Sequence, residues 1–148
     1  MGEINWTRVV LGGFVSGVVI NVVEFVLNGV VLSKDWGAAM AALGRPPMSP
    51  GQIAVLVVWS FVIWGLFVGI FSVWLYAAIR PRYGAGLKTA LGAGFVVWSL
   101  GYVLGSAGPA VMNIFPLRLI FIGLAVGLVE VLVAIPLGAW LYREQPVA

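Results

Sequence analysis

The sequence contains neither cysteine nor histidine. Their absence excludes disulfide bonds, thiol chemistry, histidine acid–base catalysis and the usual ligands of haem and copper. We therefore expect neither a cofactor nor a metal site. No nucleophile–base pair stands out among the remaining residues, so we also expect that the protein is not an enzyme.

Charged residues are also scarce. They make up 9% of the 148 residues, whereas hydrophobic residues make up 62%; soluble domains carry about a quarter charged residues. No polar connection is long enough to fold alone. The net charge of +3 comes from residues near predicted helix ends, which favours contact with anionic lipid headgroups over nucleic acid. We predict one integral membrane domain over residues 1–148.

Four apolar runs are long enough to cross a bilayer, which takes about 20 residues. They predict an all-α bundle of four transmembrane helices at about 7–32, 52–79, 87–105 and 117–142. The long connection between the first two contains Trp36, Met40 and Leu43 at helical spacing. We expect a short helix there, lying in the membrane interface through these three side chains. The alternative is an irregular loop.

Lysine and arginine predict the orientation. Five of them lie on the side of the two termini and three on the opposite side, and the excess marks the cytoplasmic side. We therefore expect an integral protein of the bacterial inner membrane with both termini in the cytoplasm. The excess is small, so insertion in both orientations stays open.

Glu24 and Glu130 are acids within predicted spans. An ionised acid near a helix centre costs about 2.5–3.5 kcal/mol on a translocon scale, so each needs a proton, a hydrogen bond or water. Glu24 precedes Lys34 by ten residues, and Glu130 follows Arg118 by twelve. These spacings correspond to ~15 and ~18 Å along a helix, which puts both acids at nearly the same depth. We predict that the first and fourth spans pack antiparallel around a shared polar centre.

Other side chains are candidates for this centre. Asn21 and Asn28 lie on the helix face of Glu24, and we expect them to form hydrogen bonds there. Two carboxyl groups in one dry site do not both ionise easily, which suits proton exchange. The alternative is that the cluster only holds helices together. Tyr102 is a further candidate to line the centre. Trp64 and Trp98 are candidates as walls for a lipophilic or cationic ligand or as plain packing residues.

Glycines recur four residues apart in every predicted span. Such spacing lets two helices approach closely, and a glycine also precedes each embedded acid by seven residues. We expect all four pairs to be helix-packing faces. They are Gly13 and Gly17, Gly65 and Gly69, Gly101 and Gly105, and Gly123 and Gly127.

The overall pattern resembles small uncharacterised bacterial membrane proteins of four helices. The resemblance depends on the letters INW at 4–6, KDW at 34–36 and WLYRE at 140–144, together with glycine-rich spans. It covers most of the chain and implies no activity. The chain is also similar to small multidrug transporters in helix number and in an acid that follows Leu-Gly-Gly. However, Glu24 lies deeper than in that family, and the long first connection and Glu130 differ as well.

Two functions are compatible with these patterns. In the first, the protein is an interaction or accessory subunit whose polar face docks a partner helix, from another membrane subunit or from a copy of itself. In the second, it is a small carrier or binding protein for a lipophilic or cationic ligand, with proton exchange at Glu24 and Glu130. Membrane lipid is an expected partner in either case.

Overall fold

The described residues of the computed structural model, 3–144, form helices and connections, and no β-strand occurs among them; at 56 and 57 the backbone alone is described. Within this range, four helices are long and apolar enough to cross a membrane, as the sequence predicts. They are Trp6–Val31, Pro50–Tyr83, Leu87–Val111 and Leu117–Trp140. The protein is therefore all-α, with four potential spans.

Three of these four helices change geometry along their length. In the first, α1 (Trp6–Glu24) continues as the π-helical η1 (Phe25–Val31). The second consists of α3 (Pro50–Gln52), η2 (Ile53–Val58) and α4 (Trp59–Tyr83), and the third of α5 (Leu87–Val97), η3 (Trp98–Val103) and α6 (Leu104–Val111). The fourth is the α-helix α7 (Leu117–Trp140). Fewer than about 1% of residues in proteins are π-helical, often at functional sites.

The third span is longer than predicted. The sequence predicts an end near residue 105, but α6 continues through Gly108 and Pro109 to Val111. In water, glycine and proline would break such a helix. In an apolar environment, backbone groups must be satisfied within the chain, so the helical conformation persists. Ser106 Oγ supports this segment by donating a hydrogen bond to Tyr102 O at 2.6 Å.

The predicted helix in the first connection is present as α2 (Ser33–Ala42). On this helix Met40 and Leu43 are exposed, Trp36 is partly buried and Ala39 is buried. That Trp36, Met40 and Leu43 lie in the membrane interface stays a prediction. Ala39 packs in a small cluster with Leu32 and with Leu119 of α7. The larger side chains of Met40 and Leu43 point away from this cluster.

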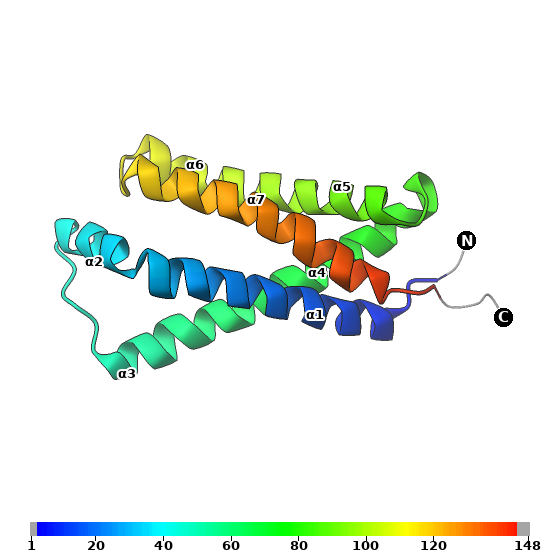
Figure 1. The fold of residues 1–148 in the computed structure, drawn as a ribbon, viewed down its shortest axis with the longest axis horizontal. Coiled ribbons are helices and arrows are strands. Elements are labelled where there is room, and N and C mark those ends of the chain that lie inside the picture. The colour runs from blue at the N-terminus through cyan, green and yellow to red at the C-terminus, as the bar shows by residue number, and fades with distance from the viewer. Residues whose placement is uncertain (1–2, 145–148) are drawn as a thin grey trace.

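The spans pack tightly at one end of the molecule. Figure 1 shows both chain termini at this end, and shows α3 and the start of α4 diverging from α1 at the other. The main core lies at the termini end and includes Val9, Val73, Ala93, Val131 and Ile135. In contrast, no residue described in η1, η3 or α6 is buried. We call these two regions the packed half and the open half. α1 and α7 contact each other and run antiparallel, as predicted.

Candidate functional site

Glycines position α1 against α4. A Cβ atom at Gly69 would overlap the backbone of Gly13 and Gly17, and one at Gly17 would lie 2.7 Å from Leu66 Cα. Beyond this seam, Asn21 Nδ2 donates a hydrogen bond to Val62 O of α4 at 3.1 Å. The amide of Asn21 therefore belongs to the contact between two helices.

A second close approach, not predicted from the sequence, joins α1 to α7. Ser16 Oγ donates a hydrogen bond to Ala134 O at 2.9 Å. A Cβ atom at Gly138 would overlap Gly12 O and the Ser16 hydroxyl. The sequence feature that could have predicted this contact is a pair of small residues four apart on each helix, Gly12 with Ser16 and Ala134 with Gly138.

Four of the expected packing glycines have other surroundings. Gly127 faces a side chain instead of a helix backbone, because a Cβ atom there would lie 2.5 Å from Tyr102 Cδ1. At Gly101, Gly105 and Gly123, no atom of the described chain lies within 4 Å of the space that a Cβ would fill. As packing faces within this chain, these three predictions are wrong. The helices diverge in the open half, so small residues there meet no neighbouring backbone.

Glu130 of α7 is the most deeply buried acid among the described residues, with 2% of its surface exposed. Tyr102 of η3 donates a hydrogen bond from its hydroxyl to Glu130 Oε1 at 2.6 Å. The other carboxyl oxygen, Oε2, is buried and has no hydrogen-bond partner within the described residues. A buried acceptor without a partner costs about 1–3 kcal/mol, and more when it is charged. Such an oxygen favours a proton or a ligand that donates to it.

Glu24 is the last residue of α1 before η1 begins. Asn28 Nδ2 donates a hydrogen bond to Glu24 Oε2 at 2.5 Å, and Asn28 Oδ1 accepts one from Trp36 Nε1 of α2 at 2.8 Å. Ser16 of α1 is hydrogen-bonded to Ala134 of the antiparallel α7, so Glu24 and Glu130 lie within about one helical turn, ~6 Å, of the same level along the two helices. The two hydrogen-bonded pairs, Glu24 with Asn28 and Glu130 with Tyr102, are therefore at similar levels. We call Glu24, Asn28, Tyr102 and Glu130 the acid cluster.

The two tryptophan candidates differ in position. Trp98 Nε1 donates a hydrogen bond to Leu124 O of α7 at 2.9 Å, and the ring packs beside the main core. Trp64 is 67% exposed and points out of the bundle, so the prediction that it lines the centre is wrong. Successive residues of an α-helix point about 100° apart. Because Gly65 of α4 faces Asn21, its neighbour Trp64 is turned away.

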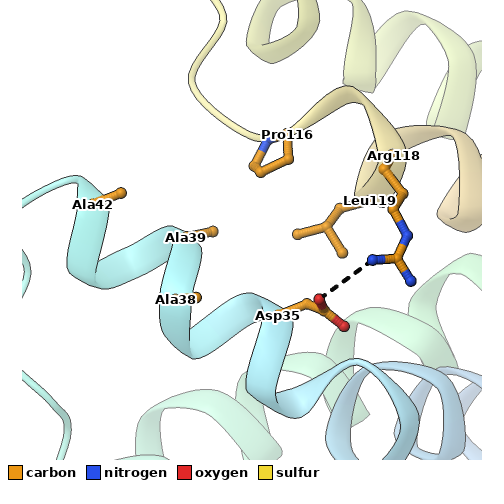
Figure 2. Close-up of a pocket in the computed structure, with 7 residues that line it drawn as sticks. All are labelled: Asp35, Ala38, Ala39, Ala42, Pro116, Arg118 and Leu119. Atoms are coloured by element: carbon orange, nitrogen blue, oxygen red, sulfur yellow. Dashed lines mark ion pairs between the residues drawn. The ribbon is translucent and has the colours of Figure 1, made fainter.

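A cavity of about 240 Å³ lies between α2 and the start of α7, in the open half. Figure 2 shows the alanine face of α2 across from Pro116 and Leu119, with an ion pair at the edge. This pair joins Arg118 Nη1 to Asp35 Oδ1 at 3.7 Å. Arg118 is largely exposed and Asp35 is partly exposed, and exposed pairs contribute about 0–1 kcal/mol. The Trp36 ring also meets Phe115 edge to face, with centroids 5.3 Å apart. These contacts hold α2 over the acid cluster.

The packed half closes the opposite side of the acid cluster. Val131, Ala134 and Ile135, in the turns of α7 that follow Glu130, have no exposed surface. At the far end, Tyr76 and Tyr142 meet edge to face with centroids 6.0 Å apart. Any opening toward the acid cluster therefore lies in the open half.

The acid cluster combines two carboxyl groups with a hydroxyl and an amide, and residues 9–33, 50–79, 89–117 and 119–142 contain no lysine or arginine. An ionised acid in the cluster thus has no basic side chain of its own span to balance it. The cluster can be neutralised by protons or by a positively charged ligand.

The chain was compared with protein-family models, with curated proteins and with solved structures, and none of them matches it.

Proposed function

We propose that this protein is a small membrane carrier that exchanges a proton for a cationic ligand at Glu130, with Glu24 as the second acid of the site. The observation that supports this proposal most directly is the Oε2 atom of Glu130, which is buried and lacks a hydrogen-bond partner among residues 3–144. A carboxyl group that only joined helices would be expected to use both of its oxygens.

Proton exchange follows from the surroundings of this oxygen. α1, which contacts α7, carries the acid Glu24, η3 brings the hydroxyl of Tyr102, and α4 has no charged residue before Arg80. A protonated carboxyl avoids the cost of burying a charge. A cation beside Oε2 would offset that cost by pairing with the ionised carboxylate. Proton and cation therefore compete for one position, and this competition couples the release of the first to the binding of the second.

The alternative function, an interaction or accessory subunit, has less support. It depends on a polar face of α1 that is free to dock a partner. The part of this face formed by Gly13, Gly17 and Asn21 is occupied by α4 of the same chain. Association with copies of itself or with other membrane subunits stays a prediction, to be tested by the mass of the purified protein in lipid.

Infrared difference spectroscopy of the protein in lipid nanodiscs tests the proposal. We expect a protonated carboxyl band that disappears as the pH is raised and that is absent from Glu130→Gln, a substitution of nearly equal size. Glu3→Gln is the matched control, because Glu3 is exposed and lies before the first span. A band that persists in Glu130→Gln, or no such band in the native protein, would show that Glu130 does not exchange a proton.

A further inference from the structure

We infer that the ligand is an amphiphilic amine that reaches the acid cluster from the lipid, with its hydrocarbon tail in an apolar groove between the first span and α7. This inference rests on the proposed function, since it takes Glu130 as the acid that gives up its proton. It adds the chemical class of the ligand and the route by which it arrives.

The groove has a volume of about 280 Å³ and an entirely apolar lining. Its residues come from the end of α1, from η1 and from one position of α7. They are Val22, Val23, Val26, Leu27, Val31 and Val126. Ligand pockets commonly measure about 300–1,000 Å³, so this groove suits a single hydrocarbon chain better than a large ring system.

Neither Glu24 nor Glu130 lines this groove, but each lies about one helical turn from a residue that does. Val126 precedes Glu130 by four residues on α7, and Leu27 follows Glu24 by three on the first span. Residues three or four apart occupy the same helix face. A tail between Val126 and Leu27 would therefore place its head group next to the two acids.

The head group is inferred from charge and hydrogen bonding. The cluster carries two acids and no base, so the ligand should be positively charged. The free Oε2 atom of Glu130 accepts hydrogen bonds, and an ammonium group donates up to three, whereas a quaternary ammonium donates none. Bound amine and Glu130 form an ammonium–carboxylate pair. When the amine arrives charged, the proton held by Glu130 leaves to water, so charge and protons balance.

The fold favours a route through the lipid. The fully buried Val131 and Ile135 close the packed half. On the other side, the hydrogen bond from Trp36 to Asn28 holds α2 over the cluster. The groove opens sideways between the two spans, where Val22, Val26 and Val31 are exposed. A lipid acyl chain could occupy the same groove, but it offers no donor to Glu130.

Binding of radiolabelled dodecylamine to the full chain in nanodiscs tests this inference, after subtraction of binding to empty nanodiscs. We expect one saturable site, with little competition from dodecanol and weaker competition from dodecyltrimethylammonium than from unlabelled dodecylamine. Equal competition by dodecanol would mean that the groove binds any hydrocarbon chain, and would overturn the proposal.

Substitutions separate the groove from the acid. Val126→Phe should fill the groove and weaken dodecylamine binding by about tenfold or more. Val26→Trp should do the same from a half-exposed position that tolerates a larger side chain. Val129→Phe is the matched control, because Val129 of α7 points outward with 63% exposure. Unchanged binding in both groove variants would contradict the inferred route.

The infrared measurement distinguishes the two proposals. In Val126→Phe we expect the carboxyl band of Glu130 to titrate as in the native protein while dodecylamine binding is lost. If the native protein shows a titrating Glu130 but no dodecylamine site, the ligand assignment fails and the proposed function stands. If Glu130 does not titrate at all, the proposed function fails, and the ligand assignment that rests on it fails as well.

Discussion

At the scale of single residues, the position of Glu130 depends on Tyr102 and on the glycine that makes room for it. The hydroxyl donates to Glu130 Oε1 at 2.6 Å, while the ring lies over Gly127, where a Cβ atom would approach it to 2.5 Å. Gly127 is thus necessary for a side-chain contact with the acid, and not for close packing of helix backbones.

Gly127→Ala should therefore displace the Tyr102 ring and weaken its hydrogen bond to Glu130. Overpacking of this kind costs about 1–3 kcal/mol, and the infrared band of the Glu130 carboxyl should shift as it does in Tyr102→Phe. Gly123→Ala, one turn earlier on α7, is the control. Within the described structure its added methyl group meets no atom within 4 Å, so it should leave the band unchanged and stabilise the helix by about 0.5–1 kcal/mol. Equal effects of the two substitutions would contradict this account.

Two asparagines on one helix face illustrate what residue type and spacing do not determine. Asn21 precedes Glu24 by three residues and Asn28 follows it by four, so both share its face. Asn21 is bound to a backbone carbonyl of α4, whereas Asn28 joins Glu24 to Trp36 of α2. The sequence predicts that both form hydrogen bonds within the membrane. The partner of each depends on which element lies opposite.

At the scale of helices, α1 contacts α7 through small residues at both sides of the interface. The carbonyl of Gly12 and the Ser16 hydroxyl lie against Gly138, and the same hydroxyl donates to Ala134 O. The Gly12 carbonyl belongs to the helix backbone, so it cannot rotate away from Gly138 as a side chain can. The antiparallel arrangement of the helices that carry Glu24 and Glu130 therefore depends on this seam, the close contact of Gly12 and Ser16 with Ala134 and Gly138.

Gly138→Ala should push α1 and α7 apart and lower the free energy of unfolding by at least about 1–3 kcal/mol. Because the seam supports the acid cluster, we also expect weaker dodecylamine binding. The control is Gly92→Ala on α5, where the added methyl group lies in open space within the described structure and should be neutral or stabilising. Unfolding in mixed micelles measures both variants. A Gly138→Ala protein as stable as the native one would show that the seam adapts.

The sequence predicts the helices well in number and position, because apolar length is a local property. It does not predict the π-helical segments η1, η2 and η3. A π-turn differs from an α-turn by a single residue in its hydrogen bonding, and no residue type in these segments requires it. Glu24 directly precedes η1, and Tyr102 lies within η3. The change in helix geometry therefore occurs where the acid cluster is formed.

At the scale of the whole molecule, a packed half with both termini is joined to an open half that contains the groove and α2. Basic residues are more numerous near the packed end, at Arg8, Arg80, Arg82, Lys88 and Arg143. The prediction that this end faces the cytoplasm follows from the positive-inside rule. If it is correct, the groove opens into the outer half of the bilayer.

The absence of native cysteine allows a direct test of orientation. A membrane-impermeant maleimide applied to intact cells should label Ala41→Cys, at the exposed end of α2, and should label Ala85→Cys only after lysis. Ala85 is exposed in the turn between α4 and α5. The reverse pattern would place the termini outside. Partial labelling of both variants in intact cells would indicate insertion in both orientations.

The sequence alone determined that the chain is all-α with four apolar spans, and it predicts two acids at matching depth, because length, hydropathy and spacing along a helix are local properties. The tertiary structure decided which faces meet. It turned Trp64 outward, left Gly101, Gly105 and Gly123 without close neighbours in the described chain, and paired Arg118 with Asp35. The physical reason is helix rotation. Spans that are apolar on nearly every side can turn about their axes at little cost in lipid, so close packing at a few small residues sets the angle.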